Sequence, residues 1–218
     1  MAKEYPQNRF EVPPGACEVI LVRHGESEAA RAGEQHELWE GQGDPDLAPT
    51  GHEQAERAAA TLSGENLAAI YVTALRRTHQ TAAPLLARLG MEARVEPGLE
   101  EVSLGDWEGG EFRIRVAEGD PLIARMLAEE EWAVIPGAES VVTFTARTTA
   151  ALSRIADRHP DETVAVVVHG GVIGALLARA SGSRPFAFVD ADNGSISRLV
   201  VAGDAWSVRS FNEISRAG

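Results

Sequence analysis

The sequence predicts an α/β protein of three layers, in which a mainly parallel sheet lies between two layers of helices and ends in an antiparallel edge. Short apolar runs alternate along the chain with stretches of helical character, a pattern typical of parallel sheets that are covered on both faces. A further short run at 205–211 follows the turn sequence AGD and favours a hairpin at one edge. The four apolar runs expected to form the other strands are 17–22, 67–73, 163–168 and about 195–202.

Three of the connecting stretches carry helix signals. Thr50 and Glu53 have the spacing of a capping box, which predicts a helix over about 50–62. A second helix is expected over about 75–89, closed by Gly90. The clearest period of 3.6 residues lies in 139–159, where Val141, Phe144, Thr148, Leu152 and Ile155 fall on one face.

We expect residues 1–218 to form a single domain, because 218 residues with 44% hydrophobic content suffice for one large core. Residues 1–15 include two adjacent prolines and are expected to form a loose N-terminal arm, which is also compatible with a subunit contact in a homodimer. The alternation breaks at about 100–137, where the sequence GDWEGG precedes one or two short helices. This excursion is expected to cap the sheet like a lid, as loops over active sites often do.

The composition argues against two classes of partner. Twenty Lys and Arg oppose 33 Asp and Glu, so the formal net charge is −13 and polyanions are repelled at long range. Neither nucleic acid nor an anionic membrane is therefore expected as a partner, and no run approaches the ~18 apolar residues of a membrane span. Cys17 is the only cysteine, which excludes an intrachain disulfide and predicts a protein of the reducing cytoplasm.

Two histidines follow strands of the predicted sheet. His24 comes after VILVR and His169 comes after VAVVV, and each is followed by a glycine, which lets the chain turn and a ligand approach the backbone. Ligands of parallel sheets bind outside the carboxyl ends of the strands, beside helix N-termini that attract anions. A single histidine in this setting is usually structural, but two in the same setting indicate a shared site.

Arginines strengthen the interpretation that this site binds an anion. Arg23 is adjacent to His24, and Arg76 and Arg77 fall in the first turn of the helix that follows the second strand. Guanidinium groups are unfavourable at the positive end of a helix dipole, so a compensating negative charge is expected there. A bound phosphate would supply that charge. The alternative for Arg76 and Arg77 is a solvated pair at the surface.

Four segments, in this order, resemble signatures of the histidine phosphatase superfamily, also called the phosphoglycerate mutase-like family. They are RHGES, TALRRTHQTA, LEEVSLGDWEG and VVVHGGVI, and they span most of the chain. The resemblance implies a phosphoglycerate mutase-like fold. It also implies that His24 is the nucleophile that becomes phosphohistidine, that Arg23, Arg77 and His169 bind the phosphoryl oxygens, and that Glu101 is the proton donor.

The neighbouring acid Glu100 is equally suitable by chemistry, and only the alignment of LEEVSLGDWEG with the family motif favours Glu101. Phosphoryl transfer further implies a neutral His24, whose second ring nitrogen is held by a backbone carbonyl, and a protonated His169. No metal and no cofactor are required. The residues that the resemblance assigns to substrate binding are Arg23, Ser27, Gln42, Gly43, Arg77, His169 and Gly170.

The sequence departs from the family pattern at two places. Ala30 replaces an asparagine that commonly touches phosphate, and the turn WEGQG over 39–43 differs from the usual one. Both changes affect the rim of the pocket, so they leave the identity of the substrate open. The remaining histidines, which have no metal-ligand spacing, are expected to be structural or exposed: His36, His52, His79 and His159.

The leading hypothesis for function is a metal-independent phosphomonoester hydrolase that acts on a small phosphorylated substrate through a phosphohistidine. A cofactor-dependent phosphoglycerate mutase is the alternative within the family, although the short chain and LGDWEG resemble the phosphatase branch. A non-catalytic scaffold that binds phosphorylated ligands is the alternative from another class. A scaffold needs the positive charge but has no use for a proton donor at Glu101.

Overall fold

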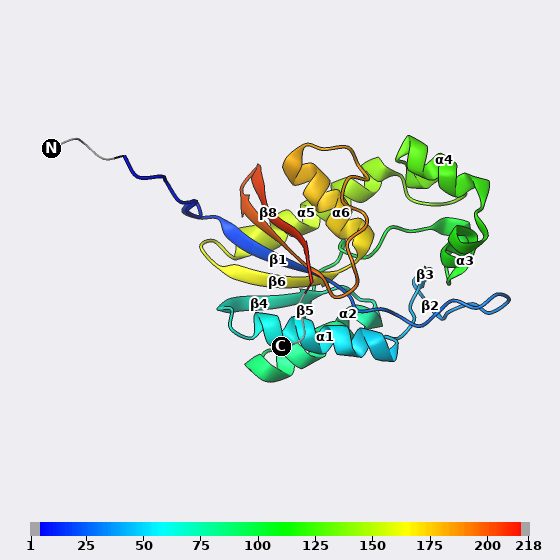
Figure 1. Cartoon of the computed structure of the whole chain (residues 1–218), viewed down its shortest axis with the longest axis horizontal. Coiled ribbons are helices and arrows are strands. Elements are labelled where there is room, and N and C mark those ends of the chain that lie inside the picture. The colour runs from blue at the N-terminus through cyan, green and yellow to red at the C-terminus, as the bar shows by residue number, and fades with distance from the viewer. Residues whose placement is uncertain (1–4, 215–218) are drawn as a thin grey trace.

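A sheet of six strands forms the centre of the protein, whose computed structural model describes residues 5–214 (Figure 1). The strands are β1 (Cys17–Arg23), β4 (Leu67–Val72), β5 (Ala93–Val95), β6 (Thr163–Val168), β7 (Ile196–Ala202) and β8 (Ala205–Glu213). Their order across the sheet is β5-β4-β6-β1-β7-β8. Strands β1, β4, β5 and β6 are parallel to one another. Strand β7 is antiparallel to both of its neighbours, β1 and β8, and it forms the predicted edge hairpin with β8. The predicted fold class is confirmed.

Helices cover both faces of this sheet (Figure 1). On one face lie α1 (Pro49–Leu62) and α2 (Arg76–Leu89), and on the other lie α5 (Val141–Arg158) and α6 (Gly170–Ser181). The predicted excursion contains α3 (Glu111–Glu118), α4 (Pro121–Glu129) and two short 3₁₀ turns, η1 (Gly105–Trp107) and η2 (Trp132–Val134). The short strands β2 (Leu38–Trp39) and β3 (Gln42–Gly43) pair in a separate hairpin.

The alternation of side chains along the strands explains why the apolar runs are continuous. In β1, Ile20 and Val22 pack into the core under α1 and α2, whereas Val19 and Leu21 pack into the core under α5 and α6. The predicted face of α5 supplies the second core, with Phe144, Thr148, Leu152 and Ile155 buried and Val141 packed against them. Residues 19–22 of β1 are therefore apolar on both faces of the sheet, and the polar residues Arg23 and His24 follow where the strand ends.

The predicted capping box at the start of α1 is wrong. The helix begins one residue earlier, at Pro49, and its N-cap residue Ala48 makes no side-chain capping bond. Proline suits the first helical position because its fixed φ is already helical and its missing N–H has no partner there. Thr50 therefore lies inside the first turn, and Glu53 pairs with Arg57 at 3.7 Å instead of capping. The expected end of the second helix is confirmed, since Gly90 ends α2 in the left-handed conformation with φ 66°.

The N-terminal arm leaves the sheet as an extended segment (Figure 1). Within it, the ring of Phe10 lies 3.5 Å from the Arg209 guanidinium of β8, while residues 1–4 lie outside the described residues. The single-domain assignment, the lid role of 100–137 and a homodimer stay predictions.

No helix among residues 5–214 is long and apolar enough to cross a membrane. Burial, with Glu162 and Glu18 nearby, raises the pKa of Cys17 to about 12, so its thiol stays protonated.

Two glycines let the start of α1 pack directly against the loop that follows β1. A Cβ on Gly25 would collide with the backbone of Gly51, and a Cβ on Gly51 would collide with the backbone of Glu26. The two segments are also joined by hydrogen bonds from Ala48 N to Glu26 O at 2.9 Å and from Glu26 N to Gln54 Oε1 at 2.7 Å. Close backbone approach therefore fixes the loop that carries His24.

We predict that Gly51→Ala lowers the free energy of unfolding by about 1–3 kcal/mol, because the added methyl group overpacks this contact. Thermal and urea denaturation of the purified variant measure the change. Gly64→Ala is the matched control, since a Cβ at exposed Gly64 meets nothing within 4 Å. Equal stability of the two variants would contradict the close-packing role of Gly51.

Candidate active site

A cavity of about 290 Å³ lies where β1, β4 and β6 end, and the predicted catalytic residues gather on one side of it. His24 follows β1, Arg77 lies in the first turn after β4, and Glu101 enters from the excursion. Arg23 at the end of β1 also lines the cavity. His169 lies immediately behind this group, with its ring centroid 5.2 Å from that of His24. The fold thus brings together all five residues that were predicted to be catalytic.

His24 is buried with a defined pattern of hydrogen bonds. Its Nδ1 lies 2.7 Å from the carbonyl oxygen of Gly25. Because a carbonyl oxygen can only accept, Nδ1 carries the proton and Nε2 keeps its lone pair. Burial, together with the charges of Arg77 and Arg23, lowers the pKa of His24 well below its usual value. The ring is therefore neutral at neutral pH, and the predicted backbone carbonyl partner is confirmed.

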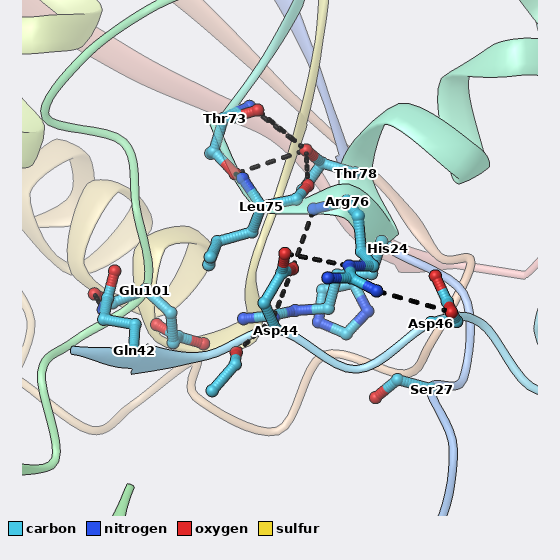
Figure 2. Close-up of polar contacts among 12 residues, drawn as sticks. His24, Ser27, Gln42, Asp44, Asp46, Thr73, Leu75, Arg76, Thr78 and Glu101 are labelled. Atoms are coloured by element: carbon cyan, nitrogen blue, oxygen red, sulfur yellow. Dashed lines mark hydrogen bonds and ion pairs between the residues drawn. The ribbon is translucent and has the colours of Figure 1, made fainter. Parts of the chain in front are cut away.

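His169 caps the N-terminus of α6 and has one partnered and one unpartnered nitrogen. Its Nε2 lies 3.1 Å from the hydroxyl of Thr73. That hydroxyl contacts the hydroxyl of Thr78 at 3.2 Å (Figure 2). Its Nδ1 is buried without a hydrogen-bond partner in the described chain. Burial, Arg77, His24 and Arg23 lower the pKa of His169 well below its usual value. Without a bound anion His169 is therefore neutral, and the protonated form expected during phosphoryl transfer stays a prediction.

Arg23 and Arg77 reach the cavity with little neutralisation. Arg23 donates one Nη1 bond to the carbonyl of Ala191, and its Nε is buried without a partner among residues 5–214. Arg77 donates from Nη1 to the carbonyl of Gly43 at 2.8 Å and lies 4.0 Å from the carboxylate of Asp44. Burial lowers the pKa of Arg77 to about 10, so it remains charged at neutral pH. Unpartnered donors and buried cations together favour an anionic ligand.

Arg76 does not line the cavity, and its guanidinium is paired with acidic side chains. Its backbone N–H donates to Asp44 Oδ1 at 2.8 Å and its Nε donates to Asp44 Oδ2 at 3.0 Å (Figure 2). Glu37 at 2.6 Å and Asp46 at 3.6 Å complete its set of acids. The negative charge that was expected at the start of α2 is thus supplied by Asp44, which the sequence analysis did not single out.

The structure distinguishes the two candidate acids. Glu101 lines the cavity, and its carboxylate accepts hydrogen bonds from Val102 N at 2.9 Å and Gly171 N at 3.1 Å. The side chain of Glu100 turns back to accept from Gly98 N at 2.7 Å and does not line the cavity. Geometry therefore selects Glu101 as the acid that can reach a substrate.

The main chain of Glu101 is held from two sides. Gln42 Nε2 donates to the Glu101 carbonyl at 2.6 Å, and Figure 2 shows the two side chains next to each other. Arg147 of α5 donates to the same carbonyl at 2.8 Å and to that of Glu100 at 2.8 Å. Glu139 fixes this guanidinium through two bonds of 2.8 Å. The position of the acid thus depends on a partly buried network that reaches into α5.

The remaining predicted binding residues separate into two groups. Gln42 and Gly43 line the cavity, as expected. Ser27 lies in an adjoining cavity, where its hydroxyl accepts from Arg113 Nη2 at 2.7 Å, so it is placed to hold Arg113 and not a ligand of the main cavity. Gly170 is the first residue of α6 and does not line the main cavity, although a Cβ there would meet the Arg23 guanidinium at 3.3 Å.

Three cavity residues were missed or misjudged from the sequence. Arg113 of α3 adds a third guanidinium, and its Nη1 donates to the Glu28 carbonyl at 2.9 Å. The carboxylate of Glu108 accepts from Gly43 N at 2.9 Å and Leu104 N at 2.8 Å. His36, expected to have no site role, also lines the cavity, and burial lowers its pKa. All three come from loop or excursion segments, whose position depends on tertiary packing.

The other histidines lie away from the cavity. His52 and His79 are exposed, whereas His159 is buried between Tyr71 OH at 3.0 Å and Glu162 at 2.6 Å. Within the described part of the chain, no three His, Cys, Asp or Glu side chains are grouped as metal ligands would be. The arginines that line the cavity are Arg23, Arg77 and Arg113.

Comparison with known proteins agrees with the sequence signatures. Phosphoglycerate mutase-like protein 4 of Arabidopsis thaliana is 32% identical over 204 residues, covering 91% of this chain and 86% of the relative. Phosphoserine phosphatase 1 of Hydrogenobacter thermophilus is 36% identical over 152 residues, covering 69% and 70%. The structure of mycobacterial glucosyl-3-phosphoglycerate phosphatase in complex with VO3 matches with a TM-score of 0.74 and 29% identity, covering 90% and 98%.

The family assignment follows from the match over nearly the whole sheet and its helices. The model of the histidine phosphatase superfamily (branch 1) matches residues 19–214, a range that contains His24, Arg77, Glu101 and His169. The four signatures and the geometry around the two histidines agree with it. The chain therefore belongs to the histidine phosphatase superfamily.

Proposed function

We propose that this phosphatase hydrolyses small phosphomonoesters in two steps, through a phosphohistidine on His24 and without a metal. The observation that carries the proposal is the buried, neutral His24, whose Nδ1–H is bound to Gly25 O and whose Nε2 lone pair is available beside Arg23 and Arg77. Such a nitrogen is a nucleophile that needs no deprotonation.

In the first step, Nε2 of His24 forms a bond to phosphorus and the bond from phosphorus to the ester oxygen breaks. Glu101 donates its proton to that oxygen, so the product leaves as a neutral alcohol. In the second step, Glu101 as carboxylate takes a proton from water, the water oxygen bonds to phosphorus, and the bond to Nε2 breaks. Inorganic phosphate leaves, and Glu101 is again protonated.

The guanidinium groups of Arg23 and Arg77 stabilise the phosphoryl oxygens during both steps. The buried Arg23 Nε and His169 Nδ1, neither with a partner among residues 5–214, are the atoms best suited to contact those oxygens. A phosphoryl dianion would supply the negative charge that His169 lacks and would favour its protonated form. The relative solved with VO3 binds an oxyanion of comparable shape.

A phosphoglycerate mutase is the second candidate, because the first step is the same and one relative is named phosphoglycerate mutase-like. A mutase returns the phosphoryl group to the substrate, so 2,3-bisphosphoglycerate would stimulate isomerisation of a phosphoglycerate. A phosphatase releases inorganic phosphate instead. Relatives named phosphoserine phosphatase and glucosyl-3-phosphoglycerate phosphatase favour hydrolysis. The fixed carboxylate of Glu101 argues against a scaffold that only binds phosphorylated ligands.

We propose further that the protein acts in the cytoplasm and has no nucleic-acid or membrane partner. The net charge of −13 and the single buried cysteine, Cys17, support this setting. A homodimer stays a prediction, and analytical ultracentrifugation of the full chain measures it.

We predict that the loss of activity in Glu101→Gln depends on the leaving group of the substrate. With an alkyl phosphate the rate should fall by about 10²–10⁴-fold, because the alkoxide needs the proton. With p-nitrophenyl phosphate, whose leaving group is stable as an anion, the phosphorylation step should be much less affected. Rapid-quench measurements with ³²P-labelled substrates separate the two steps, and labelled phosphohistidine should accumulate in this variant.

Glu100→Gln is the matched control, since its carboxylate bonds to Gly98 N outside the cavity, and it should behave like the wild-type protein on both substrates. His24→Ala should trap no label and show no turnover. An equal loss on both esters in Glu101→Gln would show that Glu101 is not the general acid. Label on any residue other than His24 would overturn the mechanism.

Chelation by EDTA should leave the rate unchanged, because arginine and histidine supply the positive charge at the phosphoryl group. The measurement is phosphate release after dialysis against EDTA, with elemental analysis of the dialysed protein as the control. Activity that is lost and then restored by added Mg²⁺ or Zn²⁺ would contradict the metal-free mechanism.

Sulfate binding should take up protons below about pH 6.5. The pKa of His169 lies well below its usual value in the cationic surroundings, and a bound dianion raises it, so affinity should increase as pH falls. Sulfate keeps its charge across this range, which separates the effect from titration of the anion. Calorimetry in two buffers of different ionisation enthalpy measures the uptake, and His169→Gln should reduce it. Binding without proton uptake at pH 5.5 would contradict this assignment.

A further inference from the structure

Most of the apolar lining of the catalytic cavity comes from one segment. The segment is the excursion, which contributes a set of five side chains that we call the aromatic wall: Val102, Leu104, Trp107, Phe112 and Trp132. Arg23, Arg77 and Glu101 are among the charged residues that line the same cavity. The cavity therefore has one part suited to a phosphoryl group and another suited to an apolar group.

The three rings of the aromatic wall contact one another and are largely fixed. Phe112 lies 6.3 Å from Trp107 and 6.4 Å from Trp132 between ring centroids. Trp107 is buried in the excursion, and Trp132 is buried while its far side packs on Phe186 at 4.6 Å. Rigid rings lose little conformational entropy on binding, so they form a ready surface for another ring or an apolar face.

The charges of the cavity do not favour a second negative group on the substrate. Three guanidinium groups line it, from Arg23, Arg77 and Arg113, together with the carboxylates of Glu101 and Glu108. These five side chains sum to about +1, so a phosphoryl dianion of roughly −2 already exceeds their positive charge. A carboxylate on the same substrate would then add an uncompensated negative charge.

Arg113 is also less available than its position suggests. Its two terminal nitrogens already donate to Ser27 Oγ at 2.7 Å and to the Glu28 carbonyl at 2.9 Å. These bonds fasten α3 to the loop after β1. A ligand carboxylate would have to compete with both of them, whereas an apolar group on the aromatic wall displaces only water.

We propose that the alcohol part of the substrate is uncharged and carries an apolar ring that packs on Trp107, Phe112 and Trp132. This rests on the proposed function, because it takes the phosphoryl group to lie beside His24. Glu101 lines the same cavity and, in this arrangement, donates its proton to the ester oxygen that joins the phosphoryl group to the ring-bearing alcohol. The cavity of about 290 Å³ limits that alcohol to a small molecule.

The test uses three primary alkyl phosphates with similar demands on the general acid: propyl phosphate, 3-phenylpropyl phosphate and 3-(phosphonooxy)propanoate. We expect kcat/KM to be roughly tenfold higher for the phenylpropyl ester than for the propyl ester, since a ring gains contact in the cavity. The carboxylate ester should be the poorest. Equal values for the phenylpropyl and propyl esters, or a preference for the carboxylate, would overturn the proposal.

Variants identify the surface responsible. Phe112→Ala should reduce the preference for the phenylpropyl ester to about threefold or less, and Phe112→Leu should restore part of it, which separates ring contact from misfolding. Val116→Ala is the matched control, because Val116 is exposed on the same helix and does not line the cavity, and the preference should persist in it. A preference that survives Phe112→Ala would overturn the assignment to the aromatic wall.

Two further variants separate this proposal from its rivals. If the carboxylate ester were preferred and Arg113→Met abolished that preference, Arg113 would be the recognition group and the proposal would fail. His24→Ala tests the underlying mechanism independently. If all three esters are hydrolysed at equal rates and the activity depends on His24, the ring proposal alone is overturned. If hydrolysis persists in His24→Ala, the proposed function is overturned.

Discussion

The parallel pairing of β1 with β6 is the constraint on which the site depends, because it brings two buried histidines next to each other. Arg23 is in register with Val168, and His24 N donates to the Val168 carbonyl at 2.9 Å, so His24 and His169 leave the sheet at the same level. A slip of one residue would turn every side chain of β1 to the opposite core. The apolar alternation that stabilises the two cores therefore also sets the distance between the two histidine rings.

The first turn of α2 places two neighbouring arginines in different surroundings. Arg76 is matched by Asp44, Asp46 and Glu37 outside the cavity, whereas the neighbouring Arg77 points inward and has only a carboxylate at 4.0 Å. Burial and the nearby cations lower the pKa values of His24 and His169. The buried cations also repel one another when no anion is bound. An oxyanion relieves that repulsion, so the same arrangement that keeps His24 neutral also favours binding of the phosphoryl group.

The parts of the site that could be predicted from sequence are those encoded next to a strand. His24, Arg23, Arg77 and His169 each follow an apolar run within a few residues, and the pattern around them is local. The capping box failed because Pro49 offers a better helix start than Thr50, a choice made by backbone geometry. Side-chain chemistry did not distinguish Glu100 from Glu101, and only the family motif favoured Glu101. The physical difference lies in a turn that Gln42 and Arg147 fix from distant parts of the chain.

Contacts of the excursion explain the remaining misses. Arg113, Glu108 and His36 reach the cavity only because tertiary contacts place α3 and its flanking turns across from the strand ends. Arg113 bonded to Ser27 is one such contact, and it gives Ser27 a role in holding α3 that a signature motif does not reveal. Spacing in the sequence carries no information about the pair of Arg113 and Ser27, which are 86 residues apart.

The excursion and the strand ends are not independent parts of this enzyme. Glu108 accepts from Gly43 N, and the carbonyl of Gly43 accepts from Arg77, so one short path of hydrogen bonds joins the excursion to the phosphoryl-binding cation. Phe112 and Trp132 make no such bond in the described residues and act through packing alone. Changes at those rings can therefore alter which alcohol fits while the cations stay in place. Changes at Glu108 act on the position of Arg77 as well, which links the choice of substrate to the chemistry at that one residue.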